Sequence, residues 1–265
     1  MNRTGRFRTT LAAAIGAATL VAAAGASALE FNQDVTPDVI FGSGSANGGF
    51  TTDRANGVEL GLRGKLRFND ANDPENTFNS NGAGTYTFEA GQPPGGGYSF
   101  APNSPSTAKW NFEWSINSDW DGTSGFMLDD LTYSIQIDFD PGPGTNFLTF
   151  DPINLAFADH GIGNNSTGNG GGTVALNDAS YASLIASNNV AQNSWNMEFF
   201  DSGTFPFNAN VGGVYTFQLS ASDSTGLLAS TSIDIVAQAV PAPATLALIG
   251  LGLLGIAVPR RRRTK

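Results

Sequence analysis

Acidic side chains gather in two glycine-containing loops of the sequence. Asp119 and Asp121 flank a tryptophan, and Asp138 and Asp140 precede a Pro-Gly-Pro-Gly segment. Carboxylates two residues apart in such a loop can turn their oxygens toward one hard cation, and Ca²⁺ takes about six to eight oxygen ligands. The glutamate that closes an EF-hand loop does not follow, which excludes that motif. Two interpretations remain, a Ca²⁺ site at Asp119, Asp121, Asp138 and Asp140 or aspartates that form turns at the surface, and the second is favoured.

Aromatic side chains offer a second kind of chemistry, because an exposed ring can stack on a sugar. Trp120 lies between two aspartates in a loop, so it is the candidate ligand-binding residue. Trp110, Phe112 and Trp114 share one face of a segment whose other face is polar. Such alternation is typical of a strand whose apolar face lies in the core, so we expect these three rings to be buried.

Candidate catalytic groups are few. The sequence has no Cys and a single His, which excludes thiolate zinc sites and multi-histidine sites. No G-x-S-x-G segment supplies a nucleophile for His160, so we expect a surface-loop histidine. Glu59 and Glu113 fall on the polar faces of predicted strands, and no motif marks them as the two carboxyl groups, about 5 to 9 Å apart, of a glycoside hydrolase. We therefore expect no enzymatic activity.

The elements that position these residues are predicted to be β-strands. Apolar and polar residues alternate with period two over residues 58–68, 86–88, 110–117 and 131–139, and shorter strands are expected at 147–150, 153–157 and 195–199. A hairpin of residues 215–221 and 229–235 closes the series, and one short helix is expected from Asn177 to Ser187, capped by Asn177. The predicted fold is all-β, an antiparallel two-sheet sandwich of jelly-roll or immunoglobulin-like type. We expect the strand at 58–68 to be half-buried, with Glu59, Arg63, Lys65 and Arg67 on its solvent face.

Both ends of the chain have the pattern of targeting segments. Residues 1–28 combine basic residues, an apolar stretch and Ala26-Ser27-Ala28, which predicts a secretory signal peptide. Residues 29–239 are then the exported domain. Residues 240–265 contain a proline motif, an apolar segment that predicts one short transmembrane helix from Ala244 to Val258, and a basic cluster that stays cytoplasmic.

The last segment resembles the PEP-CTERM sorting signal of Gram-negative bacteria. The proline motif is Val240, Pro241, Ala242 and Pro243, with Ala242 where the family most often has Glu, and the cytoplasmic stop is Arg260, Arg261, Arg262 and Arg263. The resemblance implies cleavage by the membrane protease exosortase near the proline motif. It further implies export across the inner membrane, transient membrane anchoring, and release to the cell surface or extracellular matrix.

Charge is divided unequally along the chain. Eight of the 13 basic residues lie in the two end segments, whereas all 23 acidic residues lie between them, so residues 29–240 carry five basic residues and a net charge of −18. Nucleic acid and anionic lipid are therefore poor partners for this surface, and no nucleic acid is expected to bind, because phosphate binding needs Lys and Arg.

These observations predict a non-enzymatic surface or matrix protein with a structural or adhesive role in the exopolysaccharide of a biofilm. Signal peptidase and exosortase are its expected partners during export, and exopolysaccharide is the expected partner afterwards. The alternatives are a Ca²⁺-dependent carbohydrate-binding module and, third, a matrix glycoside hydrolase. No cofactor is required by the sequence, and Ca²⁺ is the one it suggests.

Overall fold

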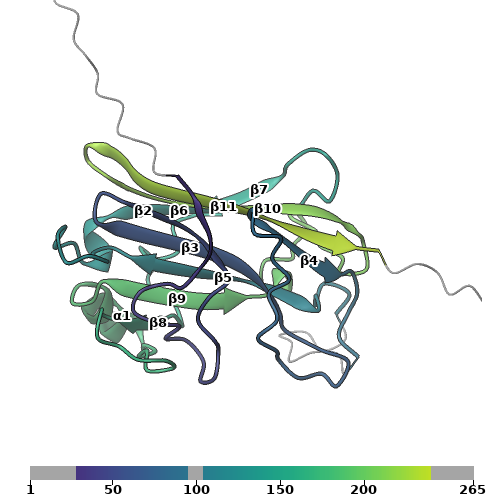
Figure 1. Ribbon diagram of the computed structural model, residues 1–265, viewed down its shortest axis with the longest axis horizontal. Coiled ribbons are helices and arrows are strands. Elements are labelled where there is room, and N and C mark those ends of the chain that lie inside the picture. Colours follow the sequence, from purple (N-terminus) through teal and green to yellow (C-terminus); the bar gives the residue numbers. More distant parts are fainter. Residues whose placement is uncertain (1–27, 95–103, 240–265) are drawn as a thin grey trace, which may run out of the picture.

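The computed structural model describes residues 28–94 and 104–239, which form two β-sheets packed face to face (Figure 1). The first sheet contains, in spatial order, β1 (Glu30–Gln33), β2 (Phe50–Ala55), β3 (Val58–Leu66), β5 (Trp110–Asn117), β9 (Val190–Trp195) and β8 (Gly161–Gly163). The second contains β4 (Thr85–Glu89), β11 (Gly226–Gln238), β10 (Gly213–Asp223), β6 (Thr132–Asp138) and β7 (Phe147–Phe150). The predicted two-sheet β architecture is confirmed, with one departure, since β4 pairs with β11 in parallel.

Most of the predicted strands are present. The segments 58–68, 86–88, 110–117, 131–139 and 147–150 correspond to β3, β4, β5, β6 and β7, and the terminal hairpin is β10 and β11. The predicted helix is α1 (Asp178–Ile185), and the Asn177 side chain caps it by accepting a hydrogen bond from Ser180 N. The predicted helix and its cap are therefore confirmed.

Two of the short strands are predicted wrongly. Residues 153–157 form a bend instead, because Asp151 Oδ1 accepts hydrogen bonds from the backbone N–H groups of Ile153 and Asn154. Residues 195–199 end β9 and enter a 3₁₀ turn, η2 (Met197–Phe199), where the Asn196 side chain accepts from Glu198 N. A second such turn is η1 (Leu128–Asp130). In both errors, a side chain supplies a local hydrogen bond that competes with strand pairing.

Rings from both sheets meet in the core between them. The Phe112 ring of β5 lies 4.5 Å from the Phe217 ring of β10, and Trp110 lies 6.3 Å from the same ring. Trp110, Phe112 and Trp114 are all buried, as the alternation predicts. The buried apolar residues of the described chain lie between Val35 and Ala237, so residues 29–239 carry a core of their own.

The outer face of the first sheet is covered, and here the expectation of a half-buried strand is wrong. The connection between β1 and β2 crosses β3, β5 and β9, and its Thr36 and Ile40 N–H groups donate to Glu59 Oε1 and Gln192 Oε1. Val35 and Val39 pack with Phe50 in a second apolar cluster beneath this connection. Glu59, Arg63 and Lys65 are consequently buried with the rest of β3.

The two targeting segments lie outside the described residues, apart from Ala28. In the described part of the chain, no helix is long and apolar enough to cross a membrane.

Candidate functional site

A layer of ion pairs lies beneath the β1–β2 connection. Arg63 Nε donates to Glu113 Oε2 at 2.6 Å across the β3–β5 register, and the Arg63 guanidinium lies 4.1 Å from the Phe50 ring centroid and 4.2 Å from that of Phe78. Lys65 Nζ lies 3.6 Å from the other Glu113 oxygen. Burial lowers the pKa of Arg63, and the Glu113 carboxylate opposes that shift. The layer is structural, because its charged groups satisfy one another.

Glu59 and Glu113, weighed above as hydrolase carboxyls, both lie in this layer rather than on a solvent face. Glu59 accepts hydrogen bonds from Arg54 Nε at 2.6 Å and from Thr36 N at 2.7 Å. Burial raises the pKa of Glu59, and these two partners oppose the rise. Both carboxylates are buried, with Glu59 0% and Glu113 1% exposed, and both are engaged in these contacts.

The aspartates of the calcium prediction are engaged in their own turns. Asp119 Oδ1 accepts from Ser124 N, Ser124 Oγ and Gly125 N at 2.8 to 3.1 Å, and Asp121 Oδ1 accepts from Thr123 N and Oγ1. Within residues 28–94 and 104–239, no group of three or more acidic or histidine side chains gathers to hold a metal ion. These contacts match the turn-forming interpretation.

The second acidic loop follows the same pattern. Asp138 Oδ1 accepts from the N–H groups of Asp140 and Asn146, and Asp140 Oδ1 accepts from Gly142 N at 2.8 Å. Calcium binding at either loop stays a prediction.

Trp120 is only partly exposed. The Arg54 guanidinium lies 5.4 Å from its ring centroid, and the backbone N–H of Trp120 donates to Gly57 O at 3.0 Å. Gly57 and Asn56 both have positive φ and form the tight turn between β2 and β3, so Trp120 packs beside that turn. One of its faces is therefore occupied by a cation, which reduces the surface left for a sugar.

The calcium prediction can be tested by thermal unfolding. Replacing Asp119 with Ala removes three hydrogen bonds and is expected to cost about 1 to 3 kcal/mol, whatever the cation. If the loop binds Ca²⁺, the Tm is expected to be higher in CaCl₂ than in NaCl of matched ionic strength. Asp121→Ala would then abolish this difference in Tm. Equal shifts in both salts, unchanged by Asp121→Ala, would show that these carboxylates serve the turns alone.

His160 is buried, 1% exposed, so the surface-loop prediction is wrong. Its ring lies 4.8 Å from the Trp114 ring and 5.8 Å from the Trp195 ring, and its Nε2 lies 2.7 Å from Pro152 O. Burial lowers the pKa of His160, against the weaker effects of Pro152 and Asp159. The ring is therefore kept neutral and acts as part of the aromatic core.

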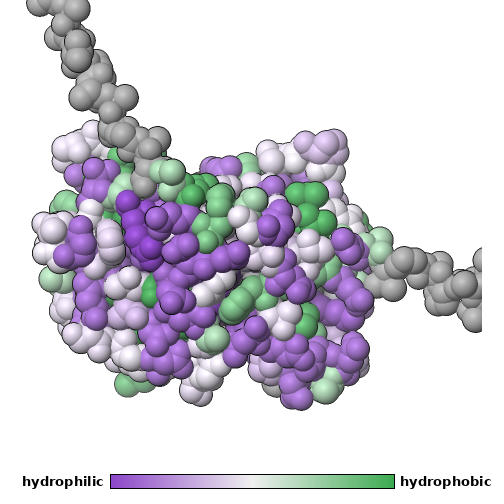
Figure 2. All heavy atoms as spheres, in the orientation of Figure 1, coloured by the Kyte–Doolittle hydropathy of each residue, from purple (hydrophilic) through white to green (hydrophobic). Residues whose placement is uncertain are grey.

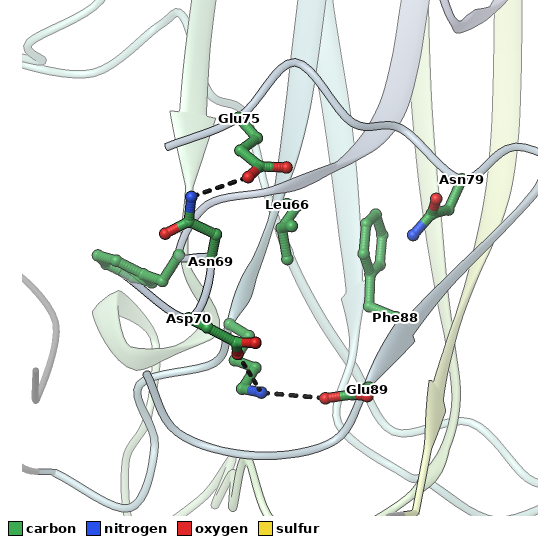
Figure 3. Close-up of a pocket in the computed structure, with 9 residues that line it drawn as sticks. Leu66, Asn69, Asp70, Glu75, Asn79, Phe88 and Glu89 are labelled. Carbon is green, nitrogen blue, oxygen red and sulfur yellow. Dashed lines mark hydrogen bonds and ion pairs between the residues drawn. The ribbon is translucent and has the colours of Figure 1, made fainter. Parts of the chain in front are cut away.

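One surface hollow is polar, and we call it the polar pocket. It has a volume of about 360 Å³ and lies where the loop after β3 meets β4. Figure 3 shows Leu66 and Phe88 between carboxylates on both sides of the hollow. Lys109 Nζ lies 3.0 Å from Glu89 and 3.9 Å from Asp70. This pocket can offer hydrogen bonds to a polar ligand, although its one ammonium is already shared between two acids.

A second hollow, the edge cleft, has a volume of about 450 Å³ and opens at one margin of the sandwich. Its lining is mostly apolar and aromatic, with a few polar groups, and consists of Phe150, Leu155, Ala158, Asp159, His160, Asn193, Ser194, Trp195, Phe199 and Phe200. Sequence reasoning missed both hollows, because each is assembled from segments far apart in the chain. A mostly apolar hollow of this size with convergent polar groups is the usual form of a ligand site.

Comparison with known proteins identifies one segment of the chain. Residues 239–263 match the PEP-CTERM protein-sorting motif, which contains the predicted proline motif and the arginine cluster, although both lie outside the described residues. No curated protein and no solved structure matches the chain. The central domain is therefore unassigned, and the motif identifies the chain as an exosortase-sorted protein destined for the cell surface or the extracellular space.

Proposed function

We propose that the mature chain is a non-enzymatic protein with a structural or adhesive role in the exopolysaccharide matrix of a biofilm. The observation that carries the proposal is the position of the sorting motif, which begins at residue 239, directly after β11 ends at Gln238. β11 is paired on both sides, with β4 and β10, and its end lies at the periphery of the sandwich (Figure 1). Cleavage on the C-terminal side of β11 would release a domain whose buried core is complete.

The processing route follows from the two end segments. Signal peptidase would remove residues 1–28, and the apolar segment before Arg260 would hold the chain transiently in the inner membrane until exosortase cuts near Pro241 and Pro243. We expect intact-mass analysis of extracellular protein from the native host to show a chain that lacks Arg260 to Arg263. Extracellular protein that keeps these arginines would contradict processing by exosortase.

The distribution of charge disfavours an anionic polymer as the partner. All five basic residues of the exported part are engaged: Arg54 with Glu30 and Glu59, Arg63 and Lys65 with Glu113, Lys109 with Glu89, and Arg67 over the Phe68 ring. The side chains of the four ion-paired residues are at most 21% exposed. Figure 2 shows a face on which hydrophilic residues dominate and hydrophobic patches are small and separate. Such a surface attracts neither nucleic acid nor an anionic polysaccharide.

A carbohydrate-binding module remains the second candidate, and the edge cleft favours it. The third candidate, a glycoside hydrolase, gains less from the structure. In the polar pocket, Lys109 Nζ lies between Asp70 and Glu89. In a glycoside hydrolase, the scissile bond of the substrate lies between the two catalytic carboxyl groups.

Fractionation of native biofilm tests the proposal. The mature protein is expected to sediment with extracellular polysaccharide and to be released when that polysaccharide is digested enzymatically. As a control, an exported protein of similar size without the sorting motif should stay in the supernatant. Mature protein found only in the supernatant, or retained after the polysaccharide is removed, would refute a role in the matrix.

A further inference from the structure

We propose that the edge cleft binds a neutral hexose polysaccharide, with its aromatic wall stacking on a sugar ring and Asp159 accepting hydrogen bonds from hydroxyl groups. The inference rests on the proposed matrix function and adds its binding site and the class of polymer.

The cleft lies at a margin where neither sheet is closed by a further strand in the described chain. β8 pairs only with residues Val190 to Gln192 of β9, so the end of β9 from Asn193 to Trp195 has no strand on that side. β7 is the corresponding edge of the second sheet, and its Phe150 ring lies 5.9 Å from the Trp195 ring. The cleft therefore runs between the two sheets and is open along an edge, where an extended polymer can enter.

The wall of the cleft is apolar and firmly supported. Phe199 is 43% exposed and Leu155 is 41% exposed, whereas the neighbouring Phe200 is partly buried. Phe200 packs edge-on against Trp195 at 5.2 Å and lies 5.8 Å from Phe150. Exposed apolar groups on a packed aromatic base suit the C–H face of a hexose ring, which needs a fixed apolar surface.

A chain of hydrogen bonds fixes the polar side of the cleft. Pro152 O can only accept, so the 2.7 Å contact assigns the proton of His160 to Nε2. His160 Nδ1 is then an acceptor, and Asn193 Nδ2 donates to it at 3.0 Å and to Asp159 Oδ1 at 3.1 Å. Asn193 Oδ1 in turn accepts from Ser194 N at 2.7 Å. Asn193 is thus held at every polar atom and orients the carboxylate.

Asp159 is exposed at the rim of this cleft. One of its oxygens is held by Asn193, and in the described chain the other accepts no hydrogen bond. A carboxylate oxygen accepts from sugar hydroxyls, and a carboxylate fixed before binding loses little conformational entropy when it does so. His160 and Asn193 are positioning residues, because they act through Asp159.

Charge disfavours an anionic polymer, and size limits the bound part of the ligand to a few sugar units. No lysine or arginine lines the cleft, and residues 29–240 carry a net charge of −18, so a uronate polymer would be repelled. The volume of about 450 Å³ lies in the usual range of small-ligand sites and suits one or two sugar units of a longer chain. A neutral hexose polymer meets both conditions.

Calorimetric titration of residues 29–239 tests the inference. The probes are cellohexaose, laminarihexaose and maltohexaose, with the galacturonic acid hexamer and the glucosamine hexamer as charged comparisons. At least one neutral probe is expected to bind, and Phe199→Ala and Asp159→Ala should each weaken it about tenfold, the loss expected for one good contact. Leu227→Ala, which removes an exposed apolar side chain at the β10–β11 turn, is the matched control and should bind like the parent.

The positioning role has its own measurement. Asn193→Ala should weaken the neutral probe as much as Asp159→Ala does, and the double variant should be no weaker than either single one. Additive losses would mean that Asn193 acts apart from Asp159. The thermal melt of each variant is recorded first, so that loss of binding is separated from loss of folding.

The inference is overturned if no neutral hexamer binds, if either charged hexamer binds more tightly, or if the cleft variants bind like the parent. Failure of the proposed matrix function would give a different set of results. Should Phe199→Ala and Asp159→Ala protein still sediment with the matrix polysaccharide, the matrix function stands and the edge cleft is not its site. Should the parent fail to sediment while its cleft binds sugar, the binding site stands and the matrix role does not.

Discussion

Replacing Arg63 with Met is expected to lower the free energy of unfolding by about 3 to 5 kcal/mol. The substitution leaves the buried Glu113 carboxylate with only Lys65 at 3.6 Å, and it also removes the hydrogen bonds of Arg63 Nη1 to Ala46 O and Gly48 O. The last two bonds tie the β1–β2 connection to β3. Urea unfolding followed by tryptophan fluorescence measures the loss.

A double variant separates the cost of an unpaired charge from the cost of lost packing. Arg63→Met with Glu113→Leu removes both charges and keeps the apolar volume between Phe50 and Phe78. We expect it to recover part of the stability, because replacing a buried ion pair with apolar groups is often close to neutral, whereas Lys65 loses its carboxylate partner and keeps its hydrogen bond to Ser45 Oγ. A double variant as unstable as Arg63→Met alone would assign the loss to the backbone contacts of the connection rather than to the unpaired, buried charge of Glu113.

This layer also shows where the sequence was insufficient. The alternation along β3 predicts the strand and its apolar face correctly, since the side-chain period of a strand is local. The alternation cannot reveal that residues 34–49 fold back over the other face of β3. Those residues have no regular pattern of their own, and their partners Glu59 and Gln192 lie far away in the sequence. One signal was available: Arg63 and Glu113 are opposite charges at register partners of neighbouring strands.

The limits of the site prediction have the same cause. The loop aspartates were identified from spacing alone, and the structure places each in its own turn, as local geometry allows. The edge cleft joins Phe150, Asp159 and Asn193 through the strand order β5-β9-β8 and the edge position of β7. Strand order is set by tertiary packing, so no window of sequence contains it. The sorting motif, in contrast, lies in one continuous segment, and its residues alone identify it.

Trp114→Ala is expected to lower the free energy of unfolding by about 3 to 5 kcal/mol. Trp114 is fully buried, and its ring contacts those of His160 at 4.8 Å and Trp195 at 5.2 Å. Removing it opens a cavity directly behind the base of the edge cleft. A loss of this size is a large fraction of the stability of an ordinary domain.

Trp114→Phe distinguishes packing from polar interaction at this position. In the described chain, the buried Nε1 of Trp114 has no hydrogen-bond partner, so a phenylalanine gives up volume and no hydrogen bond. We therefore expect Trp114→Phe to cost much less than Trp114→Ala, about 1 to 2 kcal/mol in urea unfolding. If Trp114→Ala unfolded like the parent and lost only sugar binding, the ring would be a sugar-stacking surface instead of a core residue. Equal and large losses in both variants would mean that the indole shape itself holds His160 and Trp195 in place.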